Sequence, residues 1–219
     1  MSLIPIDAKK ILEIGCSDGN LGTALKERVS HDVNVIGVEI DERLANIARN
    51  AIDYVFNENV ETLDFDALRD FAPFDCIVLG DVLEHLTTPD VLLMRLSPLL
   101  KEDGHLVSSI PNIRHVSALW TVACNGTFPR RSRGIFDSTH LRWFTIGDAK
   151  VLFESAGYSI KDEVFNLRVW DKGGGIANRL LARLPARVAA LTPIREFFTY
   201  QYSLNAQPAA GQDQFATTK

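Results

Sequence analysis

Short apolar segments alternate with helix-like segments five times in the first half of this 219-residue chain. The segment 74–81, FDCIVLGD, is almost continuously apolar, which is typical of a strand covered on both faces. Strands joined by helices run parallel within one sheet. We therefore predict an α/β, Rossmann-like, doubly wound and mostly parallel sheet with helices on both faces. The other expected strands are 10–14, 33–40, 54–59 and 105–110, and helices are expected over 21–29, 41–50 and 89–100.

The second half of the sequence is less regular but adds one helix and two late strands. Residues 145–157 favour a helix that begins at a capping threonine and ends at a glycine. The strands are expected over 158–165 and 195–206. The remaining tail is rich in Gln, Ala and Thr, so we expect a single domain over 1–206 and a flexible tail over 207–219.

The composition narrows the class of protein. A formal net charge of −5 argues against a nucleic-acid binder. Cys16, Cys76 and Cys124 are widely spaced without a CxxC pair, which favours free thiols in a reducing compartment. The sequence shows neither a secretory signal nor an apolar run as long as the roughly 20 residues that span a membrane. We expect a cytoplasmic protein.

The stretch 12–22, LEIGCSDGNLG, places a glycine-rich turn between the first strand and the helix after it. A dinucleotide fingerprint needs Gly-x-Gly-x-x-Gly, but from Gly15 onward the second and third glycine positions are Ser17 and Asn20. A phosphate-binding Walker loop needs Gly-Lys followed by Ser or Thr, which this sequence lacks. The turn fits a different nucleotide-like cofactor, and a tight turn without any ligand is the alternative.

Carboxylates near the expected strand ends identify a cofactor class. Glu13 and Asp18 flank the turn, Glu39 closes the second strand and Asp81 ends the fourth. These negative charges would repel a pyrophosphate. They suit S-adenosylmethionine, which carries an ammonium and a sulfonium and no phosphate. Glu39 is also placed to bind both hydroxyls of a ribose.

The combined motifs resemble those of class I S-adenosylmethionine-dependent methyltransferases. ILEIGCSDGNLG is similar to the first motif of that family, VIGVEID to the second, and the stretch from FDCIVLGD to SSIPN to the region around the fourth and fifth strands. PNIRHVS and GIFDSTHLRWFT most resemble a small bacterial branch that contains ubiquinone-type O-methyltransferases and enzymes found with surface-glycan glycosyltransferases. The resemblance covers about 8–170 and the last strand. It implies a seven-stranded sheet with an antiparallel last strand.

The resemblance also implies roles for residues around the expected pocket. Glu39 would bind the ribose, Ile40 would lie against the adenine, and Asp81 would face the methionine ammonium, with S-adenosylhomocysteine as product. Asn59 departs from the family pattern, in which an acidic side chain faces the adenine amine, so its carbonyl or the Val60 backbone would take that contact. The implied cofactor-binding residues are Glu13, Gly15, Cys16, Ser17, Gly19, Glu39, Ile40, Asn59, Val60, Gly80 and Asp81.

Methyl transfer to a hydroxyl requires a base near the carboxyl ends of the strands. Two of the five histidines lie where an acceptor should arrive: His140 in STHLRWFT, which we rank first, and His85 in LEHL. His31 and His105 are expected at the surface or as filler. Each candidate base could instead hold a loop by hydrogen bonding. No cluster has evident metal-ligand spacing, so we expect no metal.

Two inserts could cover the site. The first, 111–144, has five arginines and one acidic residue, Asp137, with interleaved aromatic residues. Guanidinium groups bind carboxylates and phosphates bidentately, so we expect a small-molecule or sugar acceptor that carries a negative charge, and a solvated basic surface is the alternative. The residues expected to bind the acceptor are Asn112, His115, Arg130, Arg131 and Arg142.

The second insert, 171–195, begins at three glycines and continues as an amphipathic basic stretch. A mobile lid or a homodimer contact is the plainer interpretation. Peripheral contact of 175–191 with an anionic membrane is the other. Two rival functions also stay open: a catalytically silent methyltransferase-like binding partner, and an NAD-linked oxidoreductase, which the glycine register and the carboxylates disfavour.

Overall fold

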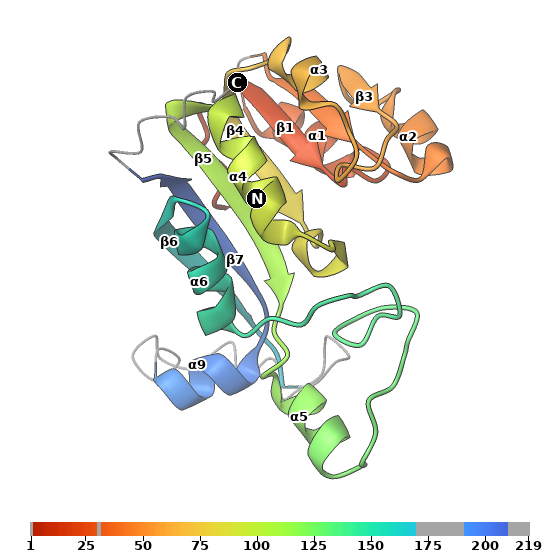
Figure 1. The fold of residues 1–219 in the computed structure, drawn as a ribbon, viewed down its shortest axis with the longest axis vertical. Helices are drawn as coiled ribbons and strands as arrows, with labels where there is room; N and C mark the ends of the chain where they lie inside the picture. The colour runs from red at the N-terminus through yellow and green to blue at the C-terminus, as the bar shows by residue number, and fades with distance from the viewer. Residues whose placement is uncertain (1, 30–31, 170–190, 210–219) are drawn as a thin grey trace, which may run out of the picture.

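The computed structural model describes residues 2–29, 32–169 and 191–209. They form one seven-stranded sheet with the order β3-β2-β1-β4-β5-β7-β6 (Figure 1). The first five strands in this order pair in parallel, and β7 pairs antiparallel with both β5 and β6. The predicted fold is thereby confirmed, including the antiparallel last strand.

The elements follow the predicted alternation, but the strand predicted from 105 begins at Leu100, the helix predicted to 100 ends at Leu96, and 65–69 form a helix that was not predicted. The strands are β1 (Lys10–Ile14), β2 (Asn34–Val38), β3 (Tyr54–Phe56), β4 (Phe74–Gly80), β5 (Leu100–Pro111), β6 (Tyr158–Leu167) and β7 (Thr199–Pro208). The helices are α1 (Asn20–Arg28), α2 (Glu42–Ala48), α3 (Phe65–Arg69), α4 (Pro89–Leu96), α5 (Val116–Ala123), α6 (Ile146–Ser155) and α9 (Thr192–Phe198), with short 3₁₀ turns η1 (Leu83–His85) and η2 (Ser97–Leu99).

Alternate side chains of the central strands enter two separate cores, one on each face of the sheet. On β1, Leu12 packs with residues of α3, α4 and α6, whereas its neighbour Ile11 packs with residues of α1 and α2. On β4, Ile77 and Cys76 divide in the same way. Both faces of these strands are therefore buried, which explains why their sequence is apolar without alternation.

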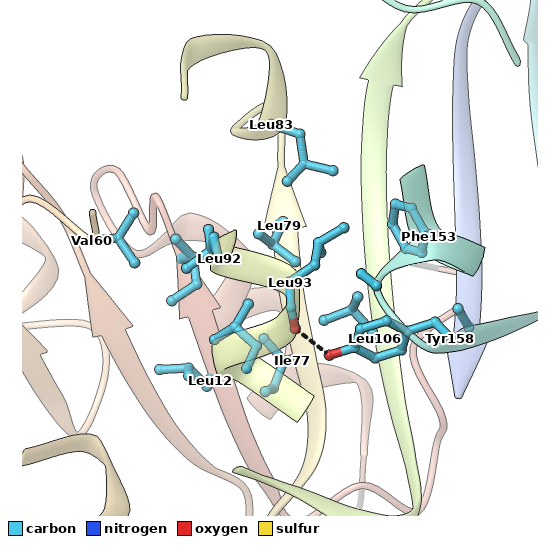
Figure 2. Close-up of a cluster of buried hydrophobic side chains, with 14 of the residues drawn as sticks. Leu12, Val60, Ile77, Leu79, Leu83, Leu92, Leu93, Leu106, Phe153 and Tyr158 are labelled. Carbon is cyan, nitrogen blue, oxygen red and sulfur yellow. Dashed lines mark hydrogen bonds between the residues drawn. The ribbon is translucent and has the colours of Figure 1, made fainter. Parts of the chain in front are cut away.

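Figure 2 shows the first of these cores, where leucines of β1, β4 and α4 meet aromatic residues from the later part of the chain. Phe153 of α6 and Tyr158 of β6 are both buried there. The Tyr158 hydroxyl donates a hydrogen bond of 2.9 Å to the carbonyl of Leu93 in α4. The late helix and strand are thus fixed to the first half of the fold.

The end of the chain differs from our expectation. The strand predicted over 195–206 is wrong at its start, because 195–198 belong to α9 and β7 begins at Thr199. At the other end β7 continues to Pro208, and Gln207 pairs with Ser159 of β6. The first two residues of the expected tail therefore belong to the sheet.

The two expected inserts have different outcomes. In 111–144, α5 and an irregular segment lie beyond the carboxyl end of β5, at the bottom of Figure 1. Most of 171–195, including nearly all of 175–191, falls outside the described residues, so its proposed lid, membrane or dimer roles stay predictions. His31 is also outside them. Among the helices that the structure does describe, none has the length and hydropathy needed to cross a bilayer.

Candidate active site

The glycine-rich turn after β1 depends on three residues in the left-handed region of backbone conformation. Gly15, Ser17 and Gly19 have φ angles of 70°, 51° and 81°. A Cβ on Gly15 would lie 2.8 Å from Cγ2 of Val82, so the turn also needs glycine there for close packing. The amides of Gly15 and Cys16 donate to the carbonyl of Val38 at 2.8 and 3.2 Å. The turn is therefore fixed against the carboxyl end of β2.

Glu39, just after β2, is buried and holds the same turn with its side chain. One carboxylate oxygen accepts a hydrogen bond of 2.8 Å from the amide of Ser17, and the other accepts one of 2.8 Å from the amide of Asp41. Asp41 in turn caps α2 through the amide of Leu44. Each oxygen of Glu39 retains a lone pair that a ribose hydroxyl can use.

Glu13 lies in the middle of the sheet behind the turn and does not bond to it. Burial, the nearby carboxylate of Asp18 and that of Glu39 raise the pKa of Glu13 to about 8. Its Oε2 has no hydrogen-bond partner within the described residues. Burial and the same carboxylates raise the pKa of the Cys16 thiol to about 12, so this cysteine stays protonated and acts as a small packing residue.

The loop after β3 carries Asn59, whose side chain is used locally. Its Oδ1 accepts a hydrogen bond of 2.9 Å from the amide of Glu61. Glu61 accepts four hydrogen bonds, from the amides and hydroxyls of Thr87 and Thr88. Burial opposes ionisation of Glu61, but these four bonds together hold its pKa below the usual value. Glu61 thereby ties this loop to the segment after η1, a role that the sequence did not reveal.

Asp81 follows β4 directly and has a φ angle of 55°, which a residue other than glycine rarely adopts. Its amide donates to the carbonyl of Ser109 on β5 at 3.0 Å. Its Oδ1 accepts hydrogen bonds from the side-chain amide of Gln201 on β7 and, at 3.5 Å, from the hydroxyl of Ser109. Burial raises the pKa of Asp81, and the bonds from Gln201 and Ser109 oppose that rise. Sequence reasoning did not identify Gln201.

A cavity of about 240 Å³ lies between these loops at the carboxyl ends of β1, β2 and β4. Seven of the predicted site residues line it, whereas the predicted residues Glu13, Cys16, Ser17, Gly19 and Gly80 are not among its lining residues. The lining residues are Ile14, Gly15, Val38, Glu39, Ile40, Glu58, Asn59, Val60, Glu61, Asp81, Val82, His85 and Leu86.

The residues that line this cavity suit S-adenosylmethionine. Glu39 and Asp81 line the cavity, and no lysine or arginine among the described residues 2–29, 32–169 and 191–209 lines it. The backbone at Gly15 leaves room that a Cβ would fill. Ile40 is 67% exposed, which leaves an apolar surface for a flat adenine ring. A cationic, phosphate-free cofactor is stabilised by this arrangement, whereas a pyrophosphate is repelled.

Glu84, His85 and His140 meet beside the cavity. The rings of His85 and His140 pack edge to face with centroids 4.7 Å apart, and Nε2 of His140 lies 4.0 Å from Oε1 of Glu84. Burial, followed by the nearby Asp81 carboxylate, raises the pKa of Glu84 to about 8. Burial lowers the pKa of His140. Both pKa shifts favour the uncharged forms of Glu84 and His140.

One potential ligand atom from each of these three residues lies within 4.8 Å of the others. Such a set could hold a divalent metal ion. Sequence reasoning did not identify this set, because Glu84 and His85 are far from His140 along the chain and only the fold brings them together. The expectation that no metal is used stays a prediction.

Asn112 and His115, predicted to bind the acceptor, are fully buried and bond to the fold itself. The Asn112 amide donates to the carbonyls of Glu196 and Thr199 at 2.8 Å, and its Oδ1 accepts from the amide of Arg114. The nitrogens of His115 contact the Ser117 hydroxyl at 2.8 Å and the Arg168 carbonyl at 2.9 Å. Neither residue lines the cavity, so both position the insert.

The arginines of the insert also bind protein groups. Arg130 donates to the carbonyl of Ser138, and Arg142 donates to the carbonyls of Leu86 and Thr87. Arg131 lies 5.6 Å from the centre of the Phe136 ring. None of these three lines the described cavity, which weakens the expectation that they bind an anionic acceptor.

Comparisons with known proteins identify the family of this chain. A family described as "Methyltransferase domain" matches residues 1–163. A ubiquinone biosynthesis O-methyltransferase of Coxiella burnetii is 31% identical over 121 residues, which cover 54% of this chain and 50% of the relative.

Solved structures show the same fold. The structure of an S-adenosylmethionine-dependent methyltransferase from Archaeoglobus fulgidus superimposes with a TM-score of 0.60 at 16% identity, over 94% of this chain and 88% of that one. The plantazolicin methyltransferase BpumL, solved in complex with SAH, gives a TM-score of 0.60 at 11% identity, over 92% of this chain and 76% of that one. The chain belongs to the methyltransferase-domain family.

Proposed function

We propose that this enzyme methylates a hydroxyl oxygen of a small molecule or glycan, with His85 as the base. The observation that carries this proposal is the position of His85, which lines the cavity next to Asp81. Its Nδ1 lies 3.2 Å from the carbonyl of Thr139. A carbonyl only accepts hydrogen bonds, so Nδ1 carries the proton and Nε2 keeps a lone pair for the acceptor hydroxyl.

The cofactor residues have separate tasks in this proposal. Glu39 binds the ribose hydroxyls with the lone pairs that Ser17 and Asp41 leave free. Ile40 covers the adenine, Asn59 and Val60 lie at its edge, and Asp81 meets the ammonium. S-adenosylmethionine supplies a methyl group that its positive sulfur already activates. The residues of this chain hold the donor, align the acceptor, exclude water and remove the hydroxyl proton.

His140 supports His85 in this proposal, which reverses our ranking from the sequence. His140 is 6% exposed and its Nδ1 donates to the carbonyl of Ile135 at 3.1 Å. It does not line the cavity, and its ring packs against that of His85. The ring therefore restricts the orientation of the base from behind.

The acceptor class rests on the chemistry of the site and on the relatives. A histidine with a free lone pair suits an oxygen acceptor, whose proton must be removed. The similarity to ubiquinone biosynthesis O-methyltransferases supports the same acceptor atom, although the aligned region is about half of their length. A phenolic small molecule and a sugar hydroxyl are the two acceptors to test first.

The test measures formation of S-adenosylhomocysteine with panels of phenols, sugars, amines and thiols. His85→Gln should lower kcat by about 10²- to 10⁴-fold with a hydroxyl acceptor, because it removes the base. His140→Gln should have a smaller effect. His105→Gln is the matched control, since His105 bonds to Asn205 on β7 and does not line the cavity. Turnover only with amines or thiols, unchanged kcat in His85→Gln, or binding without turnover would contradict the proposal.

A further inference from the structure

Gln201 connects β7, the last strand along the chain, to the carboxylate of Asp81, which we propose binds the methyl donor. It lies 120 residues after Asp81, yet its side-chain amide donates to Oδ1 of Asp81. The Ser109 hydroxyl approaches the same oxygen at 3.5 Å. No hydrogen bond to the other oxygen, Oδ2, occurs within 2–29, 32–169 and 191–209. One oxygen of Asp81 is thus held by protein donors, and the other is left for a ligand.

Asp81 needs such support because its local backbone does not provide it. Its φ angle of 55° lies in the left-handed region, which is unfavourable for an aspartate. A Cβ on the preceding Gly80 would meet nothing within 4 Å, so packing around the backbone there is loose. Donors from Gln201 on β7 and Ser109 on β5 orient this carboxylate.

We propose that Gln201 is a positioning residue for the methyl donor, which fixes the Asp81 carboxylate so that its free oxygen meets the ammonium of the donor's amino-acid part. This inference rests on the proposed role of Asp81. Gln201 does not line the cavity itself, so it acts through Asp81.

The position of Gln201 also links donor binding to the insert. Gln201 pairs with Pro111, the last residue of β5 and the first of the insert 111–144. The carbonyl of the preceding Tyr200 accepts a hydrogen bond of 2.9 Å from the amide of Asn112. The strand that orients Asp81 therefore also holds the start of the segment that covers the acceptor side.

The test compares two ligands by calorimetry in the full-length enzyme. S-adenosylhomocysteine carries the ammonium, whereas 5′-methylthioadenosine has the same adenosine and thioether without the amino-acid group. Gln201→Leu keeps the size of the side chain but removes its donor. We expect about tenfold weaker binding of S-adenosylhomocysteine and a change of less than about twofold for 5′-methylthioadenosine, as for a lost hydrogen bond to a charged group.

Three further variants separate positioning from a general structural effect. Gln207→Leu is the matched control, because Gln207 lies near the far end of the same strand and donates to the carbonyl of Asp103. Ser109→Ala removes the second donor to Asp81. It should weaken binding of S-adenosylhomocysteine by a smaller factor and leave binding of 5′-methylthioadenosine unchanged. This variant tests the inference even if Gln201→Leu does not fold. In an Asp81→Asn background, Gln201→Leu should have no further effect.

The outcomes distinguish this inference from the proposed function. Equal weakening of both ligands, unchanged binding of S-adenosylhomocysteine, or an undiminished Gln201→Leu effect in the Asp81→Asn background would each overturn the role of Gln201 while the enzyme still binds its cofactor. Failure of the wild-type enzyme to bind S-adenosylhomocysteine would overturn the donor site and this inference with it.

Discussion

The carboxylate of Glu39 and the amide of Ser17 are joined by a hydrogen bond of 2.8 Å, which connects the end of β2 to the turn after β1. The second oxygen of Glu39 accepts from Asp41 at the start of α2. A single side chain therefore organises the cofactor turn and the adjacent helix start. Because both oxygens already accept hydrogen bonds, a ribose must share them.

Replacing Glu39 with Gln should impair folding stability and cofactor binding together. The amide has one acceptor oxygen, so either Ser17 or Asp41 faces an N–H group in place of an acceptor. We expect the free energy of unfolding to fall by about 1–3 kcal/mol, as for a buried polar group left unpaired. Urea unfolding and calorimetry with S-adenosylhomocysteine measure the two effects. Glu42→Gln, at an exposed neighbouring position, should change neither.

Alanine at Gly15 should also disable the turn, for a steric reason. The residue has a φ angle of 70°, and an added Cβ would lie 2.8 Å from Cγ2 of Val82 in the cavity wall. We expect a loss of stability of at least about 1 kcal/mol and weaker binding of S-adenosylhomocysteine. Gly147→Ala is the control, because a Cβ there would meet only the Thr145 hydroxyl at 3.7 Å and α6 favours alanine. Similar stabilities of the two variants would contradict this explanation.

Glu13 should make the protein less stable as the pH rises. Its pKa is about 8 in the folded state, chiefly through burial, against the ordinary pKa of 4.5 for an unperturbed glutamate. Between these values the folded state retains a proton that the unfolded state releases, so the free energy of unfolding decreases with increasing pH. The full decrease from this group is on the order of 4 kcal/mol.

The variant Glu13→Gln stays neutral and should lose that part of the pH dependence. Urea unfolding at pH 5 and pH 8 should show a smaller difference for Glu13→Gln than for the wild type. Part of the slope should persist, because burial raises the pKa of Glu84 in the same direction. Glu154→Gln, on the exposed face of α6, is the control. Parallel profiles of Glu13→Gln and wild type would show that burial of Glu13 does not set the slope.

The local sequence predicted the parallel part of the sheet well because its strands are buried on both faces and therefore apolar without interruption. It failed at 195–198, where REFF is rich in aromatic residues and reads as a strand. The segment is the end of α9, and Arg114 pairs with Glu196 there. Pro193, near the helix start, was the available signal for a helix.

The same holds for the site: some of its contacts follow from local sequence, and others arise only from the fold. Glu39 and Asp81 follow strands, and parallel strands present their carboxyl ends at one edge, so sequence position alone predicted that they meet. Gln201 reaches Asp81 only because β7 inserts between β5 and β6, which no local pattern reveals. The predicted role of His115 in acceptor binding stays a prediction, and its complete burial could not be foreseen because a polar residue after a strand can be covered by an insert.

Arg142 should affect catalysis through the segment that carries His85. Its Nε donates to the carbonyl of Leu86 at 3.2 Å and its terminal nitrogen donates to that of Thr87. Arg142→Ala should lower kcat about tenfold, as expected when two charged hydrogen bonds to the residues after His85 are lost. Arg142→Lys should not restore it, because one ammonium does not reproduce the planar fork. Initial rates at saturating substrate measure this, and exposed Arg133→Ala should match the wild type.

Added Zn²⁺ should inhibit the enzyme, whereas EDTA should leave its activity unchanged. Ligand atoms of Glu84, His85 and His140 lie within 4.8 Å of one another, and Zn²⁺ binds carboxylate and imidazole ligands at short distances. A bound ion would occupy the His85 lone pair that the proposed reaction needs. His140→Gln removes a ligand but not the base, so it should require more Zn²⁺ for half inhibition. Loss of activity in EDTA, with recovery on addition of one divalent metal, would instead make the ion a resident cofactor of the reaction.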